Sequence, residues 1–249
     1  MPPVIPGKTK IKNMKTTMMN YTKLFKPAAG LLAIAMLFTA CTKDNNAVVT
    51  PGAAALSVIH AAPGTPELHL KVNGTKSDLK ALTFGTASPY GKIQEENLEF
   101  SITKKDSSRI ITRSTLPLRN GKNYSLFIAD IPARAAFTLI EDDLSAPATD
   151  KAKVRFVNMS PNSGNLDLVL TGQTAPVTTN TAFKAGTAFA SVTPGAELNF
   201  EIRENTKTEV LAKIEKVKIE KGKIYTIWAR GLKAAADSTK LSLAVITNK

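Results

Sequence analysis

An internal repeat is the feature that most constrains what this chain can fold into. A segment beginning at Leu56 aligns without gaps on a segment beginning at Val154, an offset of 98 residues, and later motifs align at offsets of 99 to 101. The matched pairs include Phe84 with Phe183, Leu98 with Leu198, and Tyr124 with Tyr225. One structural unit, about the size of an ordinary β-sandwich domain, therefore occurs twice.

Within each copy, apolar residues alternate with polar ones, as in Leu98, Phe100 and Ile102 and again in Leu198, Phe200 and Ile202. A period of two with turn residues between the runs is typical of half-buried antiparallel strands. The pattern predicts an all-β chain of two tandem antiparallel β-sandwich domains with about seven strands each. In the first copy the expected strands are 55–60, 67–73, 82–85, 98–104, 109–116, 122–129 and 136–141.

Aromatic residues support this interpretation. Tyr124 and Tyr225 each follow a Gly-Lys turn and open an apolar strand, the setting of a tyrosine corner, in which the hydroxyl bonds back to the backbone. Trp228 matches Phe127 and falls on the strand face opposite Tyr225. We expect the Trp228 ring to lie either in the core or against the neighbouring domain.

The N-terminal segment predicts export. Lys23 and Lys26 precede an apolar run of 13 residues, 28–40, which suits a signal peptide and is too short for a membrane span of about 20 residues. The string 37–41 resembles a lipobox, so we expect Cys41 to be acylated and to anchor the chain in the membrane. Cleavage after Ala40 that leaves a free thiol is the alternative.

These observations divide the chain into five parts. We predict a signal peptide at 1–40, with translation starting at Met14 or Met19; a lipidated flexible tether at 41–54; a first domain at 55–144; a linker at 145–151; and a second domain at 152–249.

The charge of the chain argues against a nucleic-acid partner. The 33 basic residues outnumber the 20 acidic ones, but six lysines precede Cys41, which leaves the mature chain at +7. Its lysines are interleaved with acids, as is typical of a solvated strand face and not of a phosphate-binding stripe.

The motifs of catalysis are missing from the sequence, and we predict neither an enzyme nor a cofactor. There is no serine elbow, no His-Glu-x-x-His, no phosphate loop and no dinucleotide fingerprint. His60, Glu67 and His69 are the weak candidates for a metal site. A zinc site is disfavoured, because tetrahedral sites need three or four protein ligands at a set geometry. The second copy has Asn158, Asn165 and Asp167 at these places, so we expect a solvent-facing strand edge and loop-capping hydrogen bonds instead.

Acidic residues gather at the linker. Glu141, Asp142, Asp143 and Asp150 could bind Ca²⁺ between the domains, or form a solvated acidic turn. The turn is favoured, because three adjacent acids lack the alternating spacing of a calcium loop.

The segment 58–66, Val-Ile-His-Ala-Ala-Pro-Gly-Thr-Pro, followed by a strand ending in Val72-Asn73-Gly74, resembles the opening motif of the bacterial family called domain of unknown function 4397. The resemblance covers 55–248. It implies an exported protein with immunoglobulin-like or transthyretin-like sandwiches, of a kind found as tandem copies in Bacteroidetes lipoproteins. It implies no activity.

Three functions remain open. The first is a non-catalytic outer-membrane lipoprotein, on the periplasmic or the cell-surface face, whose sandwich loops bind a protein or glycan ligand. One Trp and four Tyr give no evident sugar platform, which favours a protein. The second is an accessory subunit of an envelope complex that pairs through edge strands. An unrecognised hydrolase is the third.

Overall fold

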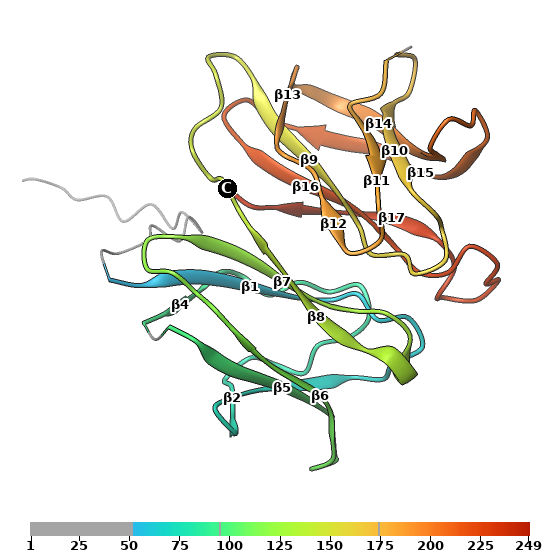
Figure 1. Cartoon of the computed structure of the whole chain (residues 1–249). Coiled ribbons are helices and arrows are strands. Elements are labelled where there is room, and N and C mark those ends of the chain that lie inside the picture. Colours follow the sequence, from blue (N-terminus) through green and yellow to red (C-terminus); the bar gives the residue numbers. More distant parts are fainter. Residues whose placement is uncertain (1–51, 95, 174) are drawn as a thin grey trace, which may run out of the picture. The chain divides into compact units, whose positions relative to one another are not determined.

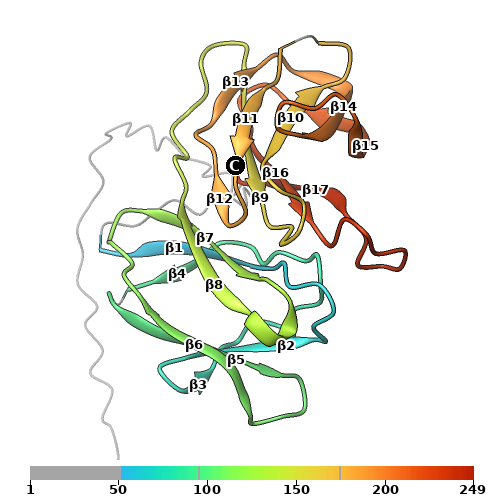
Figure 2. The ribbon, with the colours of Figure 1, turned by 45° about the vertical axis from the view of Figure 1, so that its right-hand side comes forward.

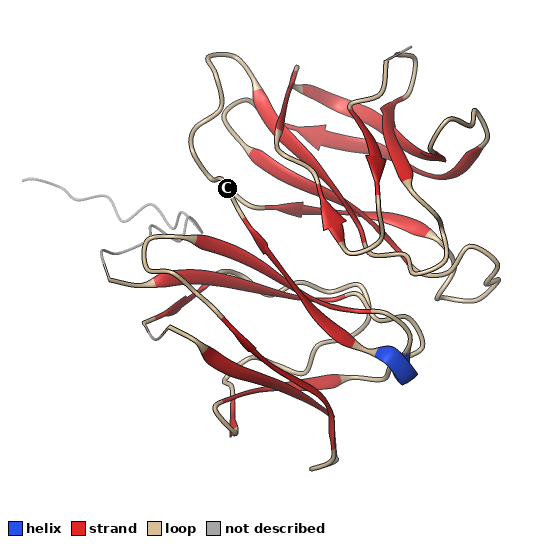
Figure 3. Ribbon diagram, viewed as in Figure 1, coloured by secondary structure: helices blue, strands red, loops and turns tan. Residues whose placement is uncertain are grey.

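The computed structural model describes residues 52–94, 96–173 and 175–249 (Figure 1). These residues form strands and loops, apart from one turn of 3-10 helix, η1 (Pro132–Arg134) (Figure 3). The all-β prediction is confirmed. Within the described ranges, no helix is long and apolar enough to cross a membrane.

The first repeat consists of two four-stranded sheets. Sheet A has the order β4-β1-β7-β8 and sheet B the order β3-β2-β5-β6. The strands are β1 (Ala54–His60), β2 (Leu68–Val72), β3 (Thr75–Lys76), β4 (Gly91–Ile93), β5 (Leu98–Lys104), β6 (Ile110–Leu116), β7 (Asn123–Ala129) and β8 (Ala136–Glu141).

The second repeat has the same plan. Sheet C has the order β12-β9-β16-β17, with β13 also paired to β9, and sheet D the order β11-β10-β14-β15. The strands are β9 (Ala152–Asn158), β10 (Leu166–Leu170), β11 (Thr178–Thr181), β12 (Ala185–Gly186), β13 (Ala190–Val192), β14 (Gly195–Glu204), β15 (Val210–Ile219), β16 (Ile224–Arg230) and β17 (Ser242–Thr247).

Most neighbouring strands pair antiparallel, as predicted, but each repeat also contains one parallel pair. β1 runs parallel to β7 and β9 runs parallel to β16. Alternation in a sequence assigns side chains to the two faces of a strand and carries no information about the direction of its neighbour.

The alternating apolar residues fill the space between the two sheets of each repeat. Leu70, Phe100 and Ile128 belong to the core of the first repeat, and Leu168, Phe200 and Ile227 to that of the second. Both tyrosine corners are confirmed. The Tyr124 hydroxyl accepts a hydrogen bond from the Arg119 N–H at 3.2 Å, and the Tyr225 hydroxyl accepts one from the Glu220 N–H at 3.0 Å.

A third apolar cluster joins the repeats. It contains Ile59 of β1, Phe127 of β7, Val157 of β9 and Trp228 of β16, all fully buried. The Phe127 and Trp228 rings meet edge to face with centroids 5.7 Å apart. The outer face of sheet A therefore packs on the outer face of sheet C, and the layers follow the order B, A, C, D (Figure 2). The Trp228 ring was expected either in the core or against the neighbouring domain, and in the structure it packs against the first repeat.

Candidate functional site

Cys41, the predicted lipidation site, lies outside the described residues, and the lipid anchor stays a prediction. The signal peptide at 1–40 lies outside them as well.

His60 is fully buried and holds a loop in place. Its Nδ1 lies 3.3 Å from the Ala62 backbone nitrogen, which donates to it, and its Nε2 lies 3.3 Å from the carbonyl oxygen of Pro66. The first contact needs an unprotonated Nδ1 and the second a proton on Nε2, so His60 is neutral. Burial lowers the pKa of His60, which also favours the neutral ring.

Asn158 makes the same two contacts in the second repeat. Its Oδ1 accepts from the Ser160 N–H at 3.1 Å, and its Nδ2 donates to the Gly164 carbonyl oxygen at 3.0 Å. The prediction of loop-capping hydrogen bonds is confirmed. The prediction that these positions face solvent is wrong for His60, Asn158 and Asp167, because all three are buried.

The structure does not bring the three weak metal candidates together. On β2, Leu68 and Leu70 point into the core, so His69 between them points to the outer face of sheet B, away from His60. Glu67 pairs with Lys105 at 2.8 Å. Across the part of the chain that the structure describes, no group of three or more His, Cys, Asp or Glu could hold a metal ion.

Asp142 departs from both expectations for the linker acids, since it is neither solvated nor grouped with other acids around a cation site. It is 3% exposed and forms an ion pair with the buried guanidinium of Arg155 at 2.5 Å. Its carboxylate also accepts hydrogen bonds from the hydroxyls of Tyr90 and Ser125. Burial and the charge of Asp142 raise the pKa of Tyr90 well above its usual value.

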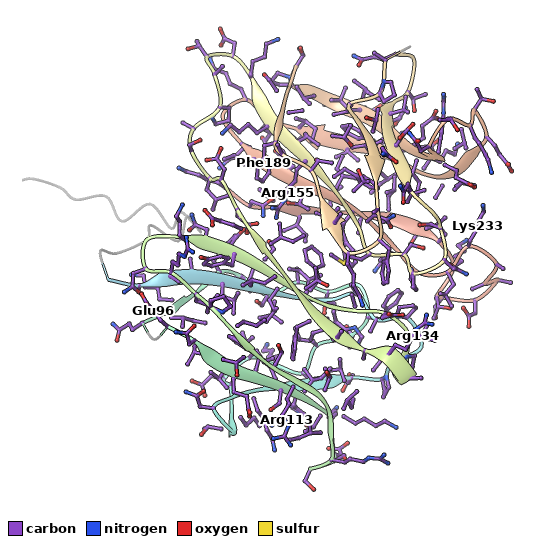
Figure 4. The ribbon with its side chains drawn as sticks, in the orientation of Figure 1. Glu96, Arg113, Arg134, Arg155, Phe189 and Lys233 are labelled. Atoms are coloured by element: carbon purple, nitrogen blue, oxygen red, sulfur yellow. The ribbon has the colours of Figure 1, made fainter. Side chains whose placement is uncertain are left out.

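Arg155 completes this network from the second repeat. Its Nε donates to the Thr226 hydroxyl at 2.8 Å, and its guanidinium carbon lies 4.8 Å from the centroid of the Phe189 ring (Figure 4). The other linker acids pair with lysines: Glu141 with Lys122, Asp143 with Lys153 and Asp150 with Lys221. Among the described residues, these acids do not come together in a group that could hold a metal ion.

A pocket opens between the sheets of the first repeat, where both sheets end in very short edge strands, β3 and β4. Its volume is about 640 Å³. Most of the wall is apolar and comes from β1, β2, β4 and β5, through Leu56, Val58, Leu70, Val72, Ile93, Leu98 and Phe100. A pocket of this size with an apolar wall is typical of a small-molecule site.

Polar groups stand among the lining residues of this pocket. Lys92 of the edge strand β4 is exposed, and no carboxylate within the described ranges pairs with it. Lys92 is opposite Ala55, outside the core between the sheets, so its long side chain has to reach the mouth of the pocket around the edge of sheet A. The Ser77 hydroxyl is buried and has no hydrogen-bond partner in the structure. An apolar wall, a cation and an unpaired hydroxyl together suit an amphipathic ligand with an anionic head.

The second repeat has bulkier side chains at two of these positions. Phe156 stands where the first repeat has Val58, and Leu170 where it has Val72, both at the offset of 98 residues. Phe156 is fully buried in the second core, and Val177 packs against that core as well. The repeat alignment therefore contained a signal for this pocket: at two core positions the first repeat has a smaller side chain than the second. A search for functional motifs does not detect such differences.

Residues 54–169 match the family described as Domain of unknown function (DUF4397). A comparison with curated proteins finds no match.

Several solved structures are similar to this chain, among them the following three. The first concerns α-glucan binding by a streptococcal virulence factor, at 12% identity over 75% of this chain and 97% of that chain, with a TM-score of 0.23. The second concerns α-glucan recognition by family 41 carbohydrate-binding modules from streptococcal virulence factors, at 14% identity over 76% and 96%, also at 0.23. The third is a candidate cell adhesion protein from Bacteroides eggerthii DSM 20697, at 9% identity over 80% and 97%, at 0.19. TM-scores this low indicate neither a shared ligand nor a shared function.

Proposed function

We propose that this chain, whose residues 54–169 match the DUF4397 family, is a non-catalytic binding protein whose first repeat takes up the aliphatic chain of an anionic amphiphile. The pocket between sheets A and B is the observation that carries the proposal. The apolar wall receives the aliphatic chain, and Lys92 at the pocket receives the anionic head. Each buried methylene contributes about 0.8 kcal/mol before the cost of association.

The proposed location of the protein agrees with such a ligand. With a lipid on Cys41, the 13 residues from there to Ala54 would reach at most about 45 Å when extended. Ala54 pairs with Ile93, which lines the pocket, so the tether enters the first repeat at the pocket. We propose that the protein is anchored to the outer membrane with its pocket near the lipid surface. Protease treatment of intact cells distinguishes the cell-surface from the periplasmic face.

A rigid scaffold is the second candidate function, and the buried contact between the repeats favours it. The Asp142–Arg155 pair and the apolar cluster around Trp228 join the repeats into one unit. Such a unit could hold a partner at a set distance from the membrane. Pocket binding and scaffolding are compatible, and the ligand experiment tests the first alone.

The test is displacement of a fluorescent fatty acid by palmitate from the mature chain without its lipid. We expect saturable binding of palmitate, with hexadecanol and octanoate at least about 10-fold weaker, since one lacks the anionic head and the other most of the aliphatic chain. A tenfold change corresponds to 1.4 kcal/mol.

Two variants locate the site. Val58→Phe introduces the side chain of the second repeat and should weaken palmitate binding at least about 10-fold, while overpacking costs about 1–3 kcal/mol of stability. Lys92→Gln should weaken palmitate and leave hexadecanol unchanged, and Lys76→Gln, which removes a nearby lysine outside the pocket, should change neither. Palmitate bound equally by the native chain and by Val58→Phe would refute the proposal.

A further inference from the structure

Arg230 has an unusual environment at the end of β16. It lies on the face of sheet C that packs toward the first repeat, where its guanidinium carbon is 5.4 Å from the Phe84 ring centroid and 5.8 Å from that of Trp228. None of the ion pairs among the described residues includes it. Arg230 is therefore a cation held between aromatic rings without an anion.

Two N–H donors in this cluster lack an acceptor. The Nε of Arg230 is buried and has no hydrogen-bond partner, and the same is true of the indole Nε1 of Trp228, whose side chain is 1% exposed. A buried donor left unpaired costs about 1–3 kcal/mol, and more when it is charged. Burial also lowers the pKa of Arg230. An acceptor that carries negative charge would relieve these costs.

Gly85 lets the guanidinium come close to the backbone of the first repeat. A Cβ built on Gly85 would lie 1.4 Å from the Nη1 of Arg230, so only glycine leaves room for this side chain. Gly85 also has a φ of +87°, which glycine adopts at no steric cost. Arg230 belongs to the second repeat, and its guanidinium therefore packs against the backbone of the first.

A pocket of about 400 Å³ adjoins this cluster, and both Gly85 and Trp228 line it. One part of its wall is polar, with Ser88, Tyr90 and Asn248, and another part is apolar, with the edge strand β17 contributing Val245 and Ile246. A sugar ring has the same two kinds of surface, hydroxyl groups at its rim and C–H groups on its faces.

We propose that this pocket binds a sugar that carries a carboxylate, with the ring against β17 and the carboxylate on Arg230, whose guanidinium borders the pocket at Gly85. The inference is independent of the amphiphile pocket, which lies between sheets A and B. The guanidinium of Arg230 offers N–H groups to both carboxylate oxygens. Tyr90 is hydrogen-bonded to Asp142 and to Asn248. The sugar hydroxyls therefore meet Ser88 and the exposed Thr247, which also line the pocket.

The chain has a built-in reporter for this test, because Trp228 is its single tryptophan. We would titrate the mature chain with glucuronate, glucose and acetate and follow the emission of Trp228. The expected result is a saturable change with glucuronate and binding at least 10-fold weaker for glucose, which lacks the carboxylate, and for acetate, which lacks the ring. Equal binding of glucuronate with either control overturns the proposal.

Matched arginine variants locate the site. Arg230→Gln should weaken glucuronate at least 10-fold, and Arg230→Lys should weaken it too, because it keeps the charge and loses the planar fork. Arg113→Gln removes the same charge from β6 in sheet B and should bind like the native chain (Figure 4). Unchanged binding in Arg230→Gln overturns the proposal. Tighter binding of a peptide with a free C-terminal carboxylate than of glucuronate overturns the sugar assignment.

Discussion

At the scale of the residue, His60 and Asn158 show that one structural task can be met by two side chains. Each accepts a backbone N–H two residues ahead and lies within hydrogen-bonding distance of a carbonyl oxygen six residues ahead, at 3.0 to 3.3 Å. The amide oxygen and nitrogen of Asn158 take the places of the two ring nitrogens of His60. The loop after the first strand of each repeat is therefore held in the same way, and His60 is a structural residue.

Replacing His60 by Asn should remove a pH dependence of folding. The pKa of His60 is lowered in the folded chain, so the unfolded chain binds the proton more readily and stability falls as the pH drops below about 6.5. In His60→Asn, the difference in unfolding free energy between pH 7.5 and pH 5.5 should be smaller than in the native chain. His60→Ala should cost about 1–3 kcal/mol at pH 7.5 and less at pH 5.5.

Urea unfolding at the two pH values measures this effect. His69→Asn is the control, since it removes the other histidine without touching the loop after β1. An identical pH dependence in the native chain and in His60→Asn would show that the ring is not held neutral by its loop.

At the scale of the element, the long strands were predictable and the short edge strands were not. Alternation in the sequence located β1, β5, β6, β7 and β8 to within a residue or two, although the structure buries both faces of β1 and β7. The predicted strand at 82–85 is wrong, since only Leu82 forms an isolated bridge there. β3 and β4 were missed, because two or three largely exposed residues carry no detectable period.

The tyrosine corners yield a prediction at this scale. Tyr225→Phe removes the acceptor of the Glu220 N–H and should lower the unfolding free energy by about 0.5–1.5 kcal/mol, and Tyr124→Phe should cost a similar amount through the Arg119 N–H. The ring and its packing are preserved in both variants. Denaturant unfolding measures the loss, and a neutral result in both would mean that the corner contributes nothing to stability.

At the scale of the whole molecule, the contact between repeats joins equivalent surfaces. Phe127 and Trp228 correspond in the repeat alignment and pack on each other, and Ile59 and Val157 correspond and share their cluster. Such self-matching contact is typical of a two-fold symmetric dimer. The symmetry is broken at Arg155, which stands where the first repeat has Ser57.

The ion-pair network of this contact could not be predicted from the sequence. The partners Tyr90, Asp142 and Arg155 come from three distant segments, and the sequence marks none of them as buried. The sequence pattern around Asp142 indicated a calcium site or a solvated turn, because such a pattern contains only neighbours along the chain. The partner of Asp142 comes from another sheet. The pocket in the first repeat depends in the same way on which strands end at the same edge.

The buried ion pair should be costly to break from one side. Arg155→Ser introduces the residue of the first repeat and leaves the Asp142 carboxylate buried without its cation, which should lower the unfolding free energy by about 3–5 kcal/mol. Asp142→Asn combined with Arg155→Ser should cost less than the sum of the single changes. Additive costs in this double-mutant cycle would contradict a direct interaction.

The central claim is that the first repeat encloses an amphiphile between its two sheets, and a crystal grown with a brominated fatty acid tests it most directly. We predict anomalous bromine density in the pocket between Leu70 and Phe100, with the carboxylate near Lys92. Bromine density only outside this pocket, or the same density in Val58→Phe as in the native chain, would contradict the claim.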